Sequence, residues 1–160
     1  MILRSVISIR YAIIRDTDVS NGDGIRVSLF VQGCNFHCKG CFNKDTWDFN
    51  GGNEWNKDIE NKFISLCKKP YIRAVSILGG EPLQQDDDLL HLLQRLKSEV
   101  GKPISLWTGY KFSDIPSDKK VLLDYIDEVT DGQFIEELRD LRLKFRGSSN
   151  QKIFVKGIDY

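Results

Sequence analysis

The sequence predicts an α/β fold, a partial (βα) barrel in which outer helices cover a splayed parallel sheet. Two observations carry this prediction. Short segments rich in Ile and Val alternate with segments whose apolar residues recur at helical spacing, a pattern typical of parallel sheets with crossover helices. The chain has 160 residues. This length suits one domain, which we expect over residues 1–160. It is well short of the ~250 residues of a complete eight-unit barrel, so we expect the barrel to be partial.

The expected strands are short and β-branched, and runs of Gly, Asn and Asp separate them from the elements that follow. They cover residues 5–14, 25–31, 73–78, 104–107, 127–130 and 152–155. The expected helices show apolar residues at helical spacing or an acidic start followed by an apolar stripe. They cover residues 55–69, 86–100, 121–126 and 134–143.

The charges of the chain are balanced, with 23 Lys and Arg residues against 23 Asp and Glu residues. No overall basic field therefore favours nucleic acid or a membrane surface as a partner. The apolar start, residues 1–6, is broken by Arg4 and resembles neither a membrane span nor a signal peptide. We expect a cytoplasmic protein with no nucleic-acid partner and no membrane partner.

Three of the four cysteines lie in one short segment with the spacing Cys34-x3-Cys38-x2-Cys41. Soft thiolate ligands at such spacing favour an iron–sulfur cluster or zinc. A closed site takes four ligands, so three cysteines would leave one iron of a four-iron cluster open to bind and activate a small molecule. The alternative is structural zinc, closed by His37 or Cys67. Cys67 falls on the apolar face of an expected helix, which favours a place in the core.

Each unusual loop of the chain follows an expected strand. Because ligands bind at the carboxyl ends of parallel strands, we expect these loops to form one site. Gly79 and Gly80 lack Cβ atoms, so the backbone there can turn sharply and face a ligand, and Glu81 offers an acceptor for a positively charged group. The segments expected at this edge are the cysteine loop after residues 25–31, Gly79-Gly80-Glu81 after 73–78, Thr108 after 104–107 and Asp131 after 127–130.

This combination of motifs resembles the radical S-adenosylmethionine enzymes. The resemblance implies that the three cysteines hold a catalytic [4Fe-4S] cluster, whose open iron binds the amino and carboxylate groups of S-adenosylmethionine. It implies that Gly79, Gly80 and Glu81 receive the methionyl end of that cofactor. Thr108 and Asp131 are then candidates for hydrogen bonds to its ribose or carboxylate.

The adenine end of the cofactor is the point at which the sequence departs from the superfamily. Many members place an aromatic residue just before the last cysteine, and here that residue is Gly40. Contacts to adenine would then come from the backbone of Gly40 and Cys41 or from Phe42.

A narrower resemblance concerns activases of glycyl-radical enzymes. The opening Asn21-Gly22-Asp23-Gly24-Ile25-Arg26 is similar to theirs, and Trp107-Thr108-Gly109-Tyr110 and Arg146-Gly147-Ser148-Ser149-Asn150-Gln151 resemble the subgroup that serves anaerobic (class III) ribonucleoside-triphosphate reductase. The resemblance implies an oxidoreductase that reductively cleaves S-adenosylmethionine to a 5′-deoxyadenosyl radical. It further implies a glycyl radical on the large subunit of that reductase and a one-electron donor such as flavodoxin.

Two alternatives stay open on the sequence. One is an activase of another glycyl-radical enzyme, of the formate-lyase type. The other is a non-enzymatic zinc-binding module. The roles of two features are also open: His37 could tune a cluster or be an exposed loop residue, and residues 146–151 could position a partner or cofactor or form a polar surface turn.

Overall fold

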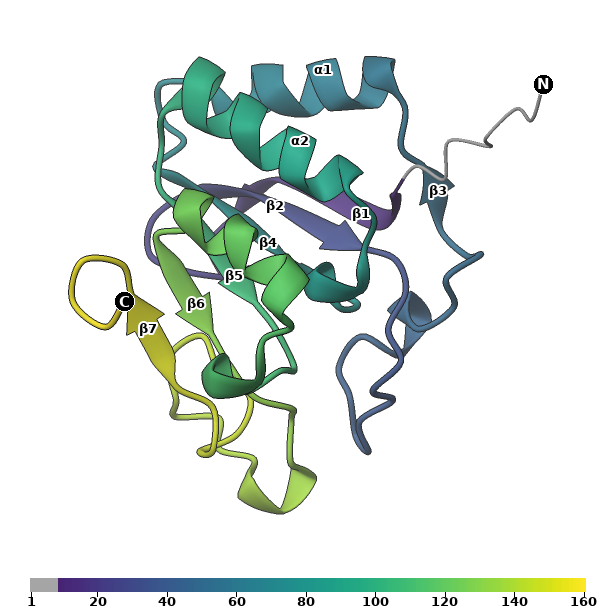
Figure 1. Cartoon of the computed structure of the whole chain (residues 1–160), viewed down its shortest axis with the longest axis vertical. Coiled ribbons are helices and arrows are strands. Elements are labelled where there is room, and N and C mark those ends of the chain that lie inside the picture. The colour runs from purple at the N-terminus through teal and green to yellow at the C-terminus, as the bar shows by residue number, and fades with distance from the viewer. Residues whose placement is uncertain (1–8) are drawn as a thin grey trace.

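Seven strands form one sheet in the computed structural model, which describes residues 9–160 (Figure 1). The strand order is β3-β1-β2-β4-β5-β6-β7. The four central strands, β2, β4, β5 and β6, run parallel, whereas the remaining pairings are antiparallel. The strands are β1 (Arg10–Asp18), β2 (Arg26–Val31), β3 (Asn53–Glu54), β4 (Ala74–Gly79), β5 (Ile104–Trp107), β6 (Glu128–Thr130) and β7 (Ile153–Val155).

The mixed α/β class is confirmed, but the expected parallel arrangement is wrong at both edges of the sheet. Only residues 19–25 join β1 to β2. A parallel crossover needs a dozen or more residues, so this pair is antiparallel. At the other edge β7 runs antiparallel to β6. Of the first expected strand, residues 5–8 lie outside the described part of the chain, and the closure of the sheet into a partial barrel stays a prediction.

Both α-helices cover the same face of the sheet (Figure 1). Helix α1 (Lys57–Cys67) begins at Asn56, whose side-chain oxygen accepts a hydrogen bond from Ile59 N at 2.9 Å, the usual role of an N-cap. Helix α2 (Asp88–Arg95) continues as a π-helical stretch, Leu96–Val100, and ends at Gly101 with a left-handed φ of 70°. Both helices lie within their expected ranges. Their buried side chains fill the core above the sheet: Phe63, Ile64, Cys67, Leu89, Leu92, Leu93 and Leu96.

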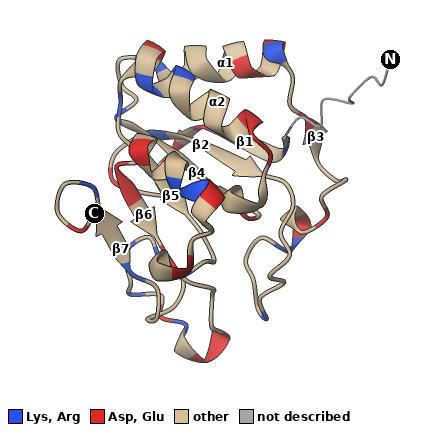
Figure 2. Ribbon diagram, viewed as in Figure 1, with Lys and Arg blue, Asp and Glu red and all other residues tan. Residues whose placement is uncertain are grey.

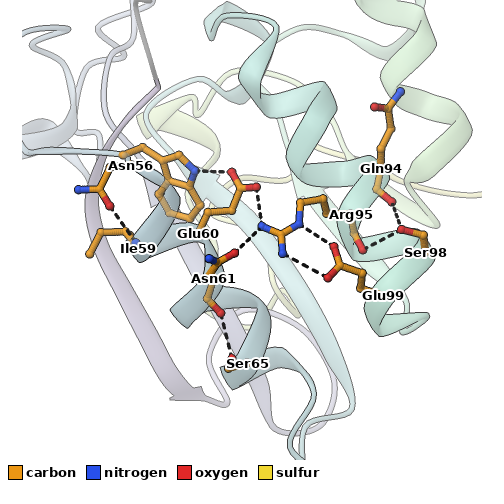
Figure 3. Close-up of polar contacts among 10 residues, drawn as sticks. Asn56, Ile59, Glu60, Asn61, Ser65, Gln94, Arg95, Ser98 and Glu99 are labelled. Atoms are coloured by element: carbon orange, nitrogen blue, oxygen red, sulfur yellow. Dashed lines mark hydrogen bonds and ion pairs between the residues drawn. The ribbon is translucent and has the colours of Figure 1, made fainter.

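A cluster of ion pairs joins the two helices at the surface (Figure 3). The Arg95 guanidinium donates to Glu60 of α1 at 2.9 Å and to Glu99, four residues further along its own helix, at 2.6 Å. Trp55 Nε1 donates to the second carboxylate oxygen of Glu60 at 2.8 Å. Surface ion pairs of this kind contribute about 1 kcal/mol or less each, so their main effect is to hold α1 and α2 in register over the core.

Two of the expected helices differ in the structure. Residues 121–125 belong to a 3-10 helix, Ser117–Tyr125, and Ile126 follows it in an extended conformation. The helix expected over residues 134–143 is wrong, because only Glu136–Leu138 makes a short 3-10 turn. The backbone after it pairs instead with a later segment: Asp140 N donates to Gly147 O at 3.2 Å, and Ser149 N donates to Leu138 O at 2.9 Å. This tertiary pairing overrides the local helix propensity of the segment.

The sheet has one apolar face and one polar face. Its apolar side chains pack beneath the helices, and the residues that alternate with them include buried serines of the central strands. On the polar face the Arg26 guanidinium donates to Ser76 Oγ at 3.2 Å and to Ser105 Oγ at 2.9 Å. Gly22, with φ of 115°, lies so close to this guanidinium that a Cβ would overlap it. The loop between β1 and β2 therefore closes over the polar face.

Lys and Arg side chains are interspersed with Asp and Glu over the helices and loops (Figure 2). This mixing accords with the equal numbers of the two classes in the sequence. Within residues 9–160, no helix combines the length and apolar character needed to span a membrane.

Candidate functional site

The loops that follow the central parallel strands surround one cavity of about 390 Å³. These loops gather at the carboxyl ends of β2, β4, β5 and β6, the edge at which parallel sheets bind ligands. The sequence-based expectation that the motifs meet at one edge is therefore confirmed for most of them. Residues from these motifs that line the cavity are Cys34, Cys38, Cys41, Phe42, Gly79, Gly80, Glu81 and Thr108.

The cysteine loop is fixed at its base by backbone hydrogen bonds. Gly33 N donates to Thr46 O at 2.6 Å, and Cys34 N donates to Trp47 O at 3.1 Å, so the loop returns to the point from which it leaves β2. Gly33 has φ of 114°, and a Cβ there would overlap the Phe49 ring. Glycine is needed at this position for both the left-handed backbone and the close approach.

The three loop cysteines are half-buried free thiols around the cavity. Burial raises the pKa of the Cys34 and Cys38 thiols, so a bound metal would have to displace their protons. Cys38 Sγ donates to Gln133 Oε1 at 3.7 Å, and Cys41 Sγ accepts from Asn43 N at 3.4 Å. Among residues 9–160, no three His, Cys, Asp or Glu side chains are gathered tightly enough to hold a single metal ion.

Cys67 lies apart from the other three cysteines. It is fully buried on the core side of α1 and does not line the cavity. Burial raises the pKa of its thiol to about 12. The core position expected from the sequence is confirmed.

The segment Gly79-Gly80-Glu81 lies directly against the base of the cysteine loop. Gly80 N donates to Val31 O at 2.9 Å, and Glu81 N donates to Gly33 O at 2.8 Å. A Cβ on Gly80 would lie only 2.5 Å from Gly33 O, closer than any real side chain could sit. The absence of side chains here lets the two backbones pack together and leaves peptide groups facing the cavity.

The Glu81 carboxylate points into the protein and is almost fully buried, with 1% of the residue exposed. Thr108 Oγ1 donates to Oε1 at 2.9 Å and to Oε2 at 3.0 Å, and Gly109 N donates to Oε1 at 2.5 Å. Leu83 N donates to Oε2 at 2.8 Å. Burial raises the pKa of this carboxyl group to about 7, although the hydrogen bonds from Leu83, Gly109 and Thr108 act in the opposite direction. The carboxylate thus organises the rim of the cavity.

Asp131 and Gly40 do not line the cavity. Asp131 Oδ2 accepts from Phe112 N at 2.9 Å, and Oδ1 accepts from Lys152 N at 3.0 Å, so this carboxylate joins two backbone segments behind the rim. Gly40 has φ of 74° and lies beside the Glu136 carboxylate. Phe42 does line the cavity, and its ring packs against Phe134 with the centroids 5.0 Å apart.

His37 is exposed and stacks on Trp47, with ring centroids 4.5 Å apart and an interplanar angle of 12°. It does not line the cavity. The exposed loop position expected for this histidine is therefore confirmed, and a role in tuning a cluster stays a prediction.

Several lining residues come from the irregular segment between β6 and β7, and most of them belong to no sequence motif. Leu141 lines the cavity and is 82% exposed. A helix was expected here, and apolar residues in a helix would have been assigned to the core. The position of this segment directly after the parallel strand β6 is the signal that could have placed it at the cavity. The residues missed are Gln133, Asp140, Leu141, Leu143 and Phe145.

The residues of this cavity fit a cluster held by three cysteines together with a small organic ligand. Three thiols from one loop are the donor set that such a cluster requires. The exposed backbone at Gly79 and Gly80 and the aromatic lining from Phe36, Phe42 and Trp107 provide surfaces for a ligand with polar and planar parts.

Comparisons with known proteins place this chain among iron–sulfur proteins. The sequence profile of a family described as a 4Fe-4S single cluster domain matches residues 20–154. An anaerobic ribonucleoside-triphosphate reductase-activating protein of Vibrio cholerae is 43% identical over 141 residues, which cover 85% of this chain and 91% of the relative. Proteins of the same name from Escherichia coli K12 and Enterobacteria phage T4 are 40% and 37% identical, over 85% and 86% of this chain and 92% and 88% of their own lengths.

Proposed function

The chain belongs to the family of anaerobic ribonucleoside-triphosphate reductase-activating proteins, and from that membership we propose that it is an iron–sulfur activase that generates a glycyl radical on such a reductase. One observation carries the proposal. The three loop cysteines and the segment Gly79-Gly80-Glu81 line the same cavity, as an enzyme needs if it is to hold a cluster beside an organic cofactor.

We assign the [4Fe-4S] cluster to Cys34, Cys38 and Cys41, and S-adenosylmethionine to the rest of the cavity. When bound, a reduced cluster would supply the one electron needed for reductive cleavage of S-adenosylmethionine, the chemistry that would allow a hydrogen atom to be taken from a glycine of the reductase. Three protein ligands leave room for such a cofactor at the fourth iron.

The residues of this chain bind the cofactor, orient it and shield it from water. Gly79 and Gly80 present bare backbone to the methionyl end, and the buried Glu81 holds Thr108 and Gly109 in place around it. Asp131 acts from behind the rim by fixing the backbone at Phe112 and Lys152. Aromatic and aliphatic lining residues limit the water beside the reacting atoms. Phe42 and the backbone of Cys41 would face the adenine, whereas Gly40 lies outside the cavity lining and would make no contact with it.

The proposed partner is the large subunit of the reductase, whose glycine-bearing segment must reach the cavity. The mouth beside Leu141 is the expected entrance, because this side chain is 82% exposed there. We further propose a partial barrel formed by the single domain 1–160, a cytoplasmic location and a one-electron donor such as flavodoxin.

The test is anaerobic reconstitution with iron and sulfide, followed by incubation with a reductant, S-adenosylmethionine and the reductase. The expected results are about four irons per chain, formation of 5′-deoxyadenosine, and a glycyl-radical signal on the reductase in electron paramagnetic resonance. A colourless protein that holds zinc and no iron would overturn the proposal in favour of a zinc module. A radical formed on a formate-lyase-type enzyme and not on the reductase would reassign the partner.

A further inference from the structure

A single cation lines the cavity among the described residues. Of the charged side chains there, Glu81 and Asp140 are acidic and Arg146 alone is basic. Glu81 is bonded within the rim. Asp140 is held by Arg142, whose Nε and Nη2 donate to its two oxygens at 3.0 and 2.9 Å. Neither acid therefore neutralises Arg146, and no carboxylate within residues 9–160 forms an ion pair with it.

The hydrogen-bonding capacity of Arg146 is largely unused. Its Nη1 donates to Gln151 O at 3.3 Å, while its Nε is shielded from solvent and has no hydrogen-bond partner. A guanidinium has five N–H donors in a planar fork that matches a carboxylate in a two-bond geometry. An unpaired buried donor is unfavourable, so an anion that enters the cavity meets a positive charge and one donor, Nε, that is already shielded from solvent.

The backbone that carries Arg146 is held rigidly. Trp107 Nε1 donates to Phe145 O at 2.8 Å on one side of it. On the other side Gln151 Oε1 accepts from Gly147 N and Ser148 N at 2.9 and 3.1 Å, and Gln151 Nε2 donates to Gly132 O at 2.9 Å. Phe145 adopts a left-handed φ of 57°, an uncommon conformation for an aromatic residue. A cation held by so many fixed neighbours loses little freedom when it binds a ligand.

We propose that Arg146 is the residue that binds the α-carboxylate of the cofactor and thereby selects ligands that carry one. The inference rests on the proposed function, because it takes S-adenosylmethionine as the occupant of the cavity. The sulfonium of this cofactor is cationic, and its α-amino group is either protonated or a ligand of the iron, so neither group gains from a guanidinium. Its carboxylate is the only anionic group that Arg146 can neutralise. Arg146 is a binding and specificity residue and takes no part in bond breaking.

The test compares two ligands on the cluster-loaded, full-length protein by anaerobic calorimetric titration. S-adenosylmethionine and decarboxylated S-adenosylmethionine share the sulfonium, the amine and the adenosine and differ only in the carboxylate. Arg146→Gln is expected to weaken S-adenosylmethionine about tenfold to a hundredfold, the size of lost charge-assisted hydrogen bonds. It should change the affinity for the decarboxylated ligand by no more than about twofold. Lys144→Gln, which removes a nearby exposed cation that does not line the cavity, should leave both affinities unchanged.

Arg146→Lys keeps the positive charge but loses the planar pair of donors of the guanidinium. The ratio of its affinity for S-adenosylmethionine to its affinity for the decarboxylated ligand should therefore fall between the ratios of the wild type and Arg146→Gln. This variant decides the question if Arg146→Gln does not take up the cluster. An affinity ratio in both variants equal to that of the wild type would overturn the inference while leaving the proposed function intact. So would a wild-type protein that binds both ligands equally well. A wild-type protein that binds neither cluster nor cofactor would overturn both.

Discussion

The Thr108 hydroxyl donates to both oxygens of the Glu81 carboxylate, at 2.9 and 3.0 Å. Thr108 follows β5 and Glu81 follows β4, so this bond joins the ends of two adjacent parallel strands at the cavity. The side chain expected from the sequence to meet a positively charged group is instead bonded to its own rim. Glu81 therefore contributes to ligand binding indirectly, because it holds Thr108 and Gly109 in place.

Replacing Glu81 by Gln should disturb the rim without changing its shape. An amide nitrogen would face one of the donors, Gly109 N or Leu83 N, and leave a buried hydrogen bond unmade, at a cost of about 1–3 kcal/mol. We expect a lower free energy of unfolding and weaker binding of S-adenosylmethionine, measured by urea unfolding and by titration. Glu54→Gln, at an exposed position, is the matched control. Equal stability of Glu81→Gln and wild type would contradict the role assigned to the carboxylate.

The same carboxyl group should make stability depend on pH. Burial raises its pKa from 4.5 to about 7, so the folded state binds the proton more tightly than the unfolded state does. The resulting stabilisation is complete below pH 4.5 and is lost as the pH rises to about 7, by a total of ~3 kcal/mol. Urea unfolding at pH 5 to 8 should show the wild-type advantage over Glu81→Gln shrinking as the pH rises. An advantage that grows with pH would mean that the three donors outweigh burial and lower the pKa.

Substitution at Gly80 should separate steric from conformational effects. Gly80→Ala places a Cβ 2.5 Å from Gly33 O and must push the end of β4 away from the cysteine loop. We expect a loss of more than about 2 kcal/mol in unfolding free energy and weaker cofactor binding. Gly101→Ala is the control, because Gly101 has φ of 70° and nothing within 4 Å of an added Cβ, so only a left-handed backbone cost of about 1 kcal/mol applies. Similar losses in both variants would rule out the steric explanation.

The four cysteines should fall into two classes. Cys34→Ala, Cys38→Ala and Cys41→Ala should each abolish the cluster, because each removes one of three ligands, and iron and sulfide analysis after reconstitution measures this directly. Cys67→Ala should keep the full iron content and lose about 1–2 kcal/mol of stability from the core. Loss of iron in Cys67→Ala alone would show that the ligand set has been wrongly assigned.

Much of the central sheet could be predicted, because β2, β4 and β5 are short runs of apolar and β-branched residues between clear turn signals. The direction of β1 could not be predicted from its own residues. Its antiparallel pairing follows from the short connection over residues 19–25, a constraint that appears only once the bounds of β1 and β2 are known. The helix expected over residues 134–143 failed for a different reason. Its hydrogen bonds go to residues 147–149, and local spacing contains no information about that pairing.

The residues of the site likewise include some that could be predicted from the sequence and some that could not. The cysteine loop and Gly79-Gly80-Glu81 could be located, since their residue types and spacing reflect a chemical need. The inward direction of the Glu81 carboxylate could not, because it depends on Thr108 and Gly109 from another strand. Leu141 and Phe145 belong to no motif, and only the folded chain brings them to the cavity.

The hydrogen bond from Glu81 N to Gly33 O, at 2.8 Å, has a consequence for the order in which the protein is loaded. Gly33 starts the metal-binding loop and Glu81 ends the segment assigned to the cofactor, so whatever steadies one steadies the other. A cluster bound at the cysteine loop lowers the entropic cost of binding the cofactor beside Gly79-Gly80-Glu81. By thermodynamic reciprocity, a bound cofactor lowers the cost of binding the cluster by the same amount. Iron-free protein should consequently bind S-adenosylmethionine weakly, and the nucleoside should in turn raise the affinity of the protein for iron.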